Sequence, residues 1–85
     1  MSRRYSRTER SVRVSGMHHL IDSDFIYDLF SLVGLVEKVV VREYRDGSPR
    51  NALVVFKDIE SVMHAMKYLH KMDVFGEQIF IHPLR

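Results

Sequence analysis

The segment Asn51-Ala52-Leu53-Val54-Val55-Phe56 decides the fold of this 85-residue chain, together with Val12-Arg13-Val14-Ser15-Gly16-Met17 about forty residues earlier. Both segments are short and rich in β-branched and apolar residues, which is typical of β-strands. In the earlier one, valines alternate with Arg13 and Ser15, the period of a strand with one buried face. Each segment leads into a helical pattern, so the sequence predicts two successive strand–helix units.

Helix signals follow both strands. The first helix is predicted to begin at Asp22 or Ser23, whose side chains can cap it, and to end at Gly34. Its apolar face is predicted to hold Phe25, Leu29, Leu32 and Val33. The second helix is predicted to run from Ile59 to about Met72 with Asp58 as its cap. Its apolar stripe is predicted to hold Val62, Ala65, Met66 and Leu69.

Two more strands complete the predicted order. Residues 35–44 form a β-branched run, and Asp46-Gly47 after it is a strong hairpin signal. The last strand follows a turn at Phe75-Gly76 and ends at Pro83. The order βαββαβ predicts an α+β, ferredoxin-like sandwich, with a four-stranded antiparallel sheet and two helices on one face.

Alternation assigns the strand residues to the two faces of this sheet. The helix-covered face is predicted to hold Val12, Val14, Val39, Val41, Ala52, Val54, Phe56, Ile79 and Ile81. The open face is predicted to hold Arg13, Ser15, Val40, Arg42, Tyr44, Asn51, Leu53, Val55, Phe80 and His82. The open face therefore combines arginines, aromatic rings and an apolar patch.

Charge is unevenly distributed along the chain. Residues 1–10 contain four arginines and one glutamate, whereas the remaining 75 residues carry a net charge of −1. The first ten residues also lack apolar periodicity, so we expect a flexible basic arm over residues 1–10 and one domain over residues 11–85. The arm arginines are expected to contact phosphates: Arg3, Arg4, Arg7 and Arg10.

Several classes of function find no support in the sequence. There is no cysteine, which excludes disulfides and thiolate metal sites and suits a reducing compartment. His18 and His19 are adjacent, and His64 and His70 lie six apart, which is not the spacing of two ligands on one helix face. No glycine-rich phosphate loop, catalytic carboxylate pair or membrane-length apolar run is present. We therefore expect no enzyme activity, no cofactor, no metal site and no membrane span.

The element order, the spacings and the two strand motifs resemble those of the RNA recognition motif family over roughly residues 11–85. Leu29-Phe30 with Gly34, and Phe75-Gly76, fit the same pattern. The sequence of residues 51–54 is similar to motifs of the polypyrimidine-tract-binding and hnRNP L type. The resemblance implies binding of single-stranded RNA, with a pyrimidine bias, in RNA processing such as mRNA splicing. It also implies a nuclear or nucleocytoplasmic protein.

The chain departs from that family at the positions of its base-stacking aromatics, where Arg13, Asn51 and Leu53 stand. Stacking on an aromatic ring is worth about 1–3 kcal/mol per base, so other groups must replace it. Aromatic rings on the outer strands, an arginine fork and an amide are suitable replacements. The predicted RNA-binding residues are Arg13, Ser15, Arg42, Tyr44, Arg50, Asn51, Leu53, Phe80 and His82.

An alternative function remains open. The missing aromatics, the near-neutral domain and the apolar patch Val40, Leu53, Val55 and Phe80 also suit a module that binds a protein or forms a homodimer. Tyr5 or Leu84 could instead fold across the sheet and cover it. In addition, Arg3-Arg4-Tyr5-Ser6 looks like a site for a kinase that selects basic residues.

Overall fold

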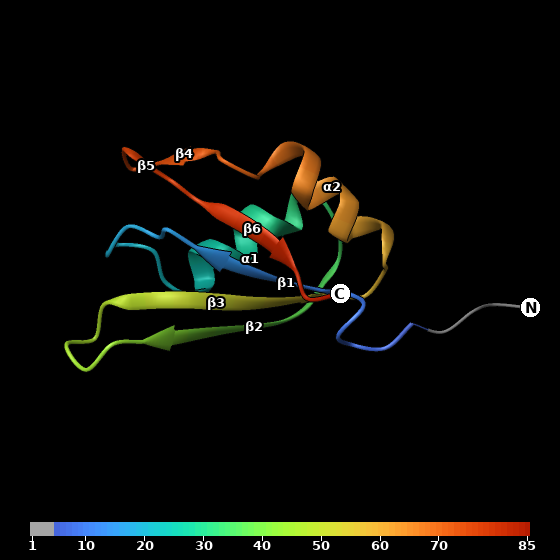
Figure 1. Ribbon diagram of the computed structural model, residues 1–85, viewed down its shortest axis with the longest axis horizontal. Helices are drawn as coiled ribbons and strands as arrows, with labels where there is room; N and C mark the ends of the chain where they lie inside the picture. The colour runs from blue at the N-terminus through green and yellow to red at the C-terminus, as the bar shows by residue number, and fades with distance from the viewer. Residues whose placement is uncertain (1–4) are drawn as a thin grey trace, which may run out of the picture.

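The computed structural model describes residues 5–85 and contains a four-stranded antiparallel sheet with two helices (Figure 1). The strands of this sheet lie in the order β2-β3-β1-β6, and β4 and β5 form a separate hairpin. The elements are β1 (Ser11–Ser15), α1 (Ser23–Ser31), β2 (Val36–Glu43), β3 (Pro49–Phe56), α2 (Glu60–Tyr68), β4 (Asp73–Val74), β5 (Glu77–Gln78) and β6 (Phe80–Pro83). Arg3 and Arg4 of the predicted arm lie outside the described residues.

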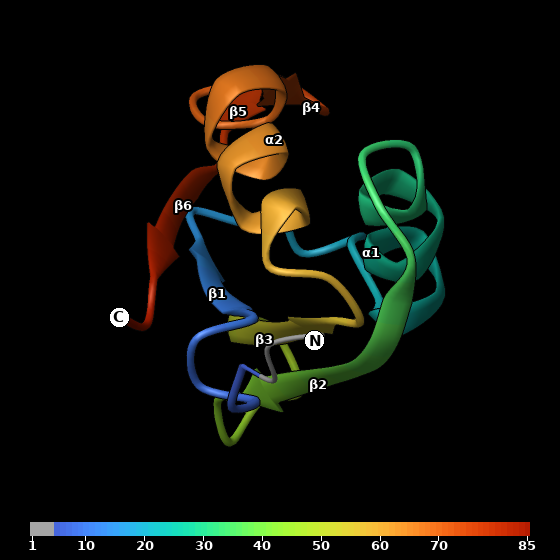
Figure 2. The same ribbon diagram turned by 90° about the vertical axis from the view of Figure 1, so that its right-hand side faces the viewer.

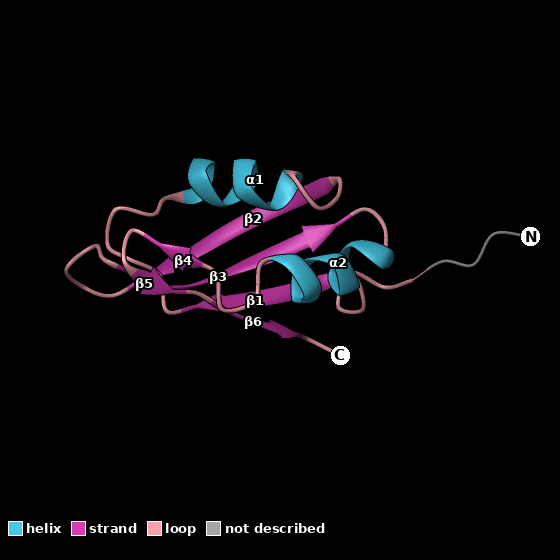
Figure 3. Cartoon of the chain, turned by 90° about the horizontal axis from the view of Figure 1, so that it is seen from above, coloured by secondary structure: helices cyan, strands magenta, loops and turns pink. Residues whose placement is uncertain are grey.

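Both helices lie on the same face of the sheet, which confirms the predicted sandwich (Figure 2). Seen from above, α1 lies over the β2 side and α2 toward the β6 side (Figure 3). The predicted inward residues of β1, β3 and β6 are fully or almost fully buried, and Val39 and Val41 of β2 are packed against the same core. The period-2 pattern therefore assigned this face correctly.

Helix α1 begins as predicted but differs in its buried face. Asp22 is the N-cap, and its carboxylate accepts a hydrogen bond of 2.8 Å from the Phe25 N–H. Its buried residues are Ile26 and Phe30, and the predicted Phe25, Leu29 and Val33 are partly buried against the same core. Leu32, predicted to lie on the apolar face, is 79% exposed, because the helix ends at Ser31 and Leu32 is its C-cap.

Helix α2 is shorter than the sequence predicts. Its N-cap is Ile59, and no side chain caps it, so the predicted role of Asp58 was wrong. Asp58 contributes its backbone carbonyl instead, which accepts from the Ser61 N–H at 3.3 Å. The helix ends at Tyr68 rather than Met72, and three residues later Lys71 has a positive φ of 66°, which is incompatible with a continued helix.

Gly34 has a different role from the predicted helix-ending glycine. It does not have a positive φ, and α1 has already ended at Ser31. A Cβ atom built on Gly34 would lie 2.0 Å from Ser61 Oγ and 2.4 Å from Ser61 Cβ. Glycine is therefore required here because the loop after α1 passes directly against the start of α2.

The predicted turn at Phe75-Gly76 is confirmed. Phe75 and Gly76 have φ values of 56° and 85°, and they connect the two short strands of the β4–β5 hairpin. Two successive positive φ angles are typical of a type I′ turn, which suits the twist of a hairpin. The Asp73 carboxylate accepts a hydrogen bond of 2.9 Å from the Gly76 N–H, which stabilises the turn.

Candidate nucleic-acid interface

The open face of the sheet carries a central row of side chains that crosses all four strands. Val40 on β2 is paired with Leu53 on β3, Leu53 with Arg13 on β1, and Arg13 with His82 on β6. Residues paired directly across antiparallel strands present their side chains on the same face. Arg13 therefore lies at the centre of the face, between an apolar side and an imidazole.

A second row lies next to it, toward the β2–β3 hairpin. Here Arg42 is paired with Asn51, and Ser15 is paired with Phe80. Phe80 lies beside Gly16, where an added Cβ would be 3.1 Å from Phe80 Cδ2. Phe80 keeps 36% of its surface exposed. An aromatic ring is thus available on β6, although none stands at the central positions.

Three arginines surround a hollow of about 400 Å³ on this face. The hollow is lined by Arg13, Arg42, Arg50, Asn51, Leu53 and Leu84. None of the three arginines forms an ion pair with a carboxylate among residues 5–85. Guanidinium groups without acidic partners can donate paired hydrogen bonds to phosphate oxygens or base edges. The hollow therefore suits an anionic ligand with planar groups.

Tyr44 lies beside Arg50, one of the arginines that line the hollow. The Arg50 guanidinium carbon lies 5.9 Å from the centre of the Tyr44 ring, within the range of a cation–π contact. Tyr44 is exposed, and its N–H donates to the Ser48 carbonyl at 2.9 Å within the turn. This turn thus presents an aromatic ring and a cation together at one side of the face.

Two further residues belong to the site: Leu84, which the sequence suggested could cover the sheet, and His70, which the sequence analysis did not place on this face. Leu84 lines the hollow because its N–H donates to the Ser11 carbonyl, at 3.2 Å, which holds the chain after β6 against β1. His70 accepts a hydrogen bond of 2.9 Å at Nδ1 from the Ile81 N–H at the outer edge of β6. Its ring lies 6.0 Å from that of Phe80 and 6.4 Å from that of His82, edge-on to both. No sequence spacing indicated these contacts.

Val55 does not belong to the exposed apolar patch that the sequence predicts. Val55 and its cross-strand neighbour Ser11 are 3% and 2% exposed. Ser11 Oγ donates to the Arg7 carbonyl, which holds residues 6–10 against this end of the sheet. These residues lie on the side of the sheet away from the helices (Figure 2). The exposed apolar patch is consequently smaller than expected, and the open face is covered at this end.

We call residues 6–10 the N-terminal turn. Ser6 Oγ accepts from the Glu9 N–H at 3.2 Å, and the Glu9 carboxylate accepts from the Ser6 N–H at 3.1 Å. This reciprocal pair has the pattern of a capping box. The Arg10 N–H completes the turn by donating to the carbonyls of Ser6 and Arg7. The segment predicted to be part of a flexible arm thus forms a hydrogen-bonded turn.

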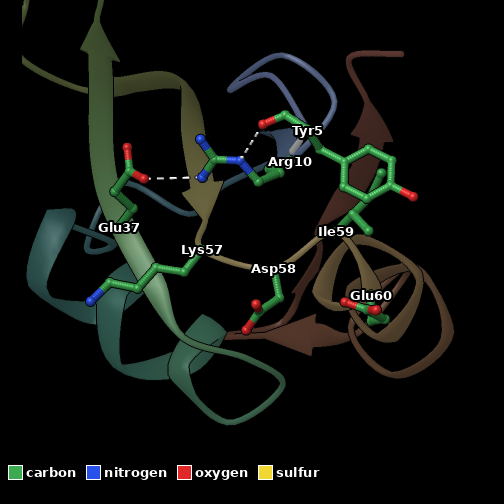
Figure 4. Close-up of a pocket in the computed structure, with 7 residues that line it drawn as sticks. All are labelled: Tyr5, Arg10, Glu37, Lys57, Asp58, Ile59 and Glu60. Carbon is green, nitrogen blue, oxygen red and sulfur yellow. Dashed lines mark hydrogen bonds and ion pairs between the residues drawn. The ribbon is translucent and has the colours of Figure 1, made fainter. Parts of the chain in front are cut away.

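Arg10 fastens the turn to the sheet (Figure 4). Its guanidinium donates to the Glu37 carboxylate at 3.0 Å, the Phe56 carbonyl at 2.6 Å and the Tyr5 carbonyl at 3.1 Å. Arg7 Nε lies 2.8 Å from the other Glu37 oxygen. Arg7 and Arg10 are predicted phosphate contacts, but here both pair with Glu37, because β2 brings this carboxylate to the turn. Their phosphate contact and the boundary at residue 10 stay predictions.

A second hollow lies beside this network and has mixed charge. Its lining is Tyr5, Arg10, Glu37, Lys57, Asp58, Ile59 and Glu60 (Figure 4). Three carboxylates and two cations surround it, so it has no preference for an anion. Tyr5 lies there with Ile59 near the start of α2, and so it does not cross the sheet as one expectation had it.

Acid is expected to release the N-terminal turn. The hydrogen bond from Arg10 is the main cause that lowers the pKa of Glu37, with the charges of Arg7 and Arg10 adding to it and burial opposing it. A lowered folded-state pKa means that the stabilisation is complete above the pKa of the unfolded chain and is lost as the pH falls through the folded value.

This expectation can be measured by following the amide resonances of residues 6–10 from pH 7 to pH 2. The turn resonances should move together with the titration of Glu37, below the ordinary glutamate range. Glu37→Gln should already show the released turn at pH 7. A turn that stays unchanged in this variant would show that Glu37 does not hold it.

Comparison with known proteins agrees with this geometry. The family model described as RNA recognition motif matches residues 12–79. The chain is 32% identical over 72 residues to the mouse (Mus musculus) protein named splicing regulator RBM11, covering 84% of this chain and 30% of that protein. It is 31% identical over 77 residues to bovine (Bos taurus) RNA-binding protein 7, covering 89% and 29%. The chain thus spans about a third of the length of these curated relatives.

Solved structures show the same fold. The third RNA recognition motif of Mip6 superposes with a TM-score of 0.80 at 23% identity, covering 92% of this chain and 96% of that one. The motif of Rna15, solved with bound RNA (GU), gives a TM-score of 0.77 at 23% identity, covering 85% and 79%. At this identity the likeness concerns the fold alone.

Residues 5–85 lack two further features. No helix there is long and apolar enough to cross a membrane. No group of three or more metal-ligating side chains converges in the same residues. The arginine-lined hollow remains the arrangement with the clearest chemical preference.

Proposed function

The chain belongs to the RNA recognition motif family, and from that premise we propose that it binds single-stranded RNA on the open face of its sheet. The observation that supports this most is the hollow lined by Arg13, Arg42 and Arg50, none of which is paired with an acid among the described residues. Backbone phosphates are the natural partners of such a group, and base edges can share it.

The two rows and the hollow between the arginines supply the contacts that position a nucleotide. Arg13 takes the place of the usual central aromatic, and its flat guanidinium can stack on a base while it donates to a phosphate. Asn51 offers both an amide donor and a carbonyl acceptor to a base edge. Leu53 and Leu84 provide the apolar walls of the hollow. Arg13 and Asn51 are therefore weaker in stacking but richer in hydrogen bonds than an aromatic pair.

Base stacking moves to the outer strands in this proposal. Phe80 on β6 and Tyr44 beside the hairpin are exposed at opposite sides of the face. His82 lies in the central row next to Arg13, and Ser15 pairs with Phe80 in the next one. We infer that the RNA crosses the sheet between β6 and β2 and stacks one base at each side.

The names of the relatives support a role in RNA processing such as splicing, and a nuclear or nucleocytoplasmic location. A pyrimidine preference remains part of the proposal, because residues 51–54 are similar to motifs of pyrimidine-binding members of the family. The arginines Arg3 and Arg4, outside the described residues, would add salt-dependent attraction to phosphates without reading sequence.

Phe80→Ala is expected to weaken RNA binding about tenfold, because one stacked base is worth about 1–3 kcal/mol. The measurement is a ¹⁵N–¹H NMR titration with short U-, C- and A-rich RNAs at low and moderate salt. In the unaltered chain, shifts at Arg13, Asn51 and Phe80 should survive added salt. Tyr27→Ala, which removes an exposed ring from α1, is the matched control. Shifts confined to residues 3–10 and abolished by salt would refute binding on the sheet.

A second candidate function is protein binding or dimerisation, and the helical layer favours it. Leu32, Met63 and Tyr68 are large, apolar or aromatic and mostly exposed. Leu32 and Tyr68 line a hollow together with Val33, His64 and Leu69. Light scattering tests for a homodimer. The average mass in solution should rise with protein concentration, and it should be lower for Leu32→Ser than for the unaltered chain. This surface faces away from the arginines, so both functions can coexist.

A further inference from the structure

We propose that Ser6 is a phosphorylation site for an arginine-selecting serine/threonine kinase, and that the phosphate opens the N-terminal turn. The modification and the opening stand independently of RNA. Their effect on RNA affinity rests on the function proposed above. Three features support the proposal: the sequence before Ser6, the hydrogen bonds of Ser6, and the place of the turn on the sheet.

The sequence before Ser6 suits such a kinase. Arg3 and Arg4 precede the serine by three and two residues, and kinases use patterns of charge to select their substrates. Ser6 is exposed, as are Arg7 and Thr8 that follow it. The segment can therefore approach a kinase without any opening of the core.

The chemistry is ordinary phosphoryl transfer from Mg-ATP. Ser6 Oγ forms a bond to the γ-phosphorus while the bond from that phosphorus to the β,γ-bridging oxygen breaks. ADP leaves, and the hydroxyl proton passes to the catalytic base of the kinase. The product is a phosphoserine with a charge of about −1.5 to −2 at neutral pH.

The hydroxyl that would be modified is part of the capping box. Ser6 Oγ accepts a hydrogen bond from the Glu9 N–H at 3.2 Å, and the Glu9 carboxylate accepts one from the Ser6 N–H at 3.1 Å. A phosphate on Ser6 would be forced close to this carboxylate, and like charges at such a distance repel each other. The reciprocal arrangement would therefore be lost, and the turn would open at its first residue.

Opening would be transmitted to the sheet through the neighbouring residues. The Arg7 carbonyl, which accepts a hydrogen bond from Ser11 Oγ, belongs to the turn. Arg10 also belongs to it, and its N–H donates to the carbonyls of Ser6 and Arg7. Movement of the turn would expose Val55 and Ser11, which are almost completely buried now. The phosphate, with a charge of about −1.5 to −2, would also offset half or more of the net charge of +3 that residues 1–10 carry.

The modification is tested on the full chain with a purified arginine-directed kinase and Mg-ATP, followed by mass spectrometry. One phosphate is expected on Ser6, with none there in Ser6→Ala. The double variant Arg3→Gln/Arg4→Gln should lower kcat/KM at least tenfold. Phosphate found on another residue, or no loss in the double variant, would overturn the site.

The opening is tested by NMR on the phosphorylated chain, without RNA. The amides of residues 6–10 and the methyl groups of Val55 should shift together. The control is Glu9→Gln, which keeps the capping box but removes the repelling charge, so its turn should stay closed after phosphorylation. Unchanged Val55 methyl groups in the phosphorylated chain would overturn the opening.

RNA binding then separates the two proposals. Phosphorylation should lower the affinity for a short uridine-rich RNA at least fivefold and reduce its dependence on salt. An unmodified chain that fails to bind RNA would refute the proposed function, while the mass and turn measurements still decide on Ser6. An unmodified chain that binds, with affinity unaltered by the phosphate, would overturn the coupling to RNA.

Discussion

Arg13→Ala is expected to weaken RNA binding about thirtyfold while leaving the domain folded. Arg13 is exposed at the centre of the open face, between Leu53 and His82. A hydrogen bond to a charged group contributes about 1.5–3 kcal/mol, and a loss of about 2 kcal/mol corresponds to this factor. An exposed side chain that makes no ion pair in residues 5–85 can be truncated with little effect on stability. The measurement is fluorescence anisotropy with a labelled uridine-rich RNA.

Arg45→Ala is the matched control for this experiment. Arg45 lies after β2 in the exposed hairpin turn and does not line the hollow, and its replacement by alanine removes the same charge as Arg13→Ala. Its loss should therefore cost less than threefold and should act mainly through the salt dependence. The loss of RNA affinity in Arg13→Lys should lie between the losses in Arg13→Ala and Arg45→Ala, because an ammonium retains the charge without the planar guanidinium. Equal losses in Arg13→Ala and Arg45→Ala would contradict a specific role for Arg13.

Gly34→Ala is expected to lower the free energy of unfolding by about 3 kcal/mol, near the upper end for overpacking. The added Cβ would lie 2.0 Å from Ser61 Oγ, and Ser61 is itself buried at the start of α2. One of the two segments must move, and the core residues beneath α2 move with it. Denaturation with urea, followed by circular dichroism, gives the change directly.

Two further variants isolate the cause. Ser61→Gly removes both atoms that the new methyl group would meet, so the double variant Gly34→Ala/Ser61→Gly should regain part of the loss. Gly47→Ala places a methyl group in open space but at a φ of 87°, and it reports the cost of backbone strain alone. That cost is about 1–2 kcal/mol. A double variant that is no better than the sum of its parts would contradict the proposed clash.

The sequence predicted the sheet and its two faces because the relevant signal is local. In β1, buried valines alternate with Arg13 and Ser15, and this alternation needs only neighbouring residues. The pairing of Arg13 with Leu53 follows once both strands are known. Most of the candidate site was therefore predictable, including the exposure of Arg42 and Tyr44.

The parts that the sequence did not predict depend on contacts between distant segments. Val55 is buried because the N-terminal turn is fastened by Glu37, and nothing near Val55 indicates this. The His70 ring meets the Phe80 ring although the segment that contains the β4–β5 hairpin separates them. Gly34 matched a general rule for helix ends, whereas its true constraint comes from Ser61 in another helix. Local rules cannot supply such long-range contacts.

The position of β1 between β3 and β6 has a consequence for synthesis on the ribosome. Its first partner follows only after two intervening elements, and its second is the last strand. About 65 residues separate the end of β1 from Phe80, which at about 5–20 residues per second takes roughly 3–13 s. Throughout that time the edge of β1 that pairs with β6 lacks its hydrogen-bonding partner. Translation that stalls before Phe80 would therefore leave an incomplete sheet with an unpaired edge. Such an edge can pair with other chains, so we expect chaperones to bind the nascent domain at this stage.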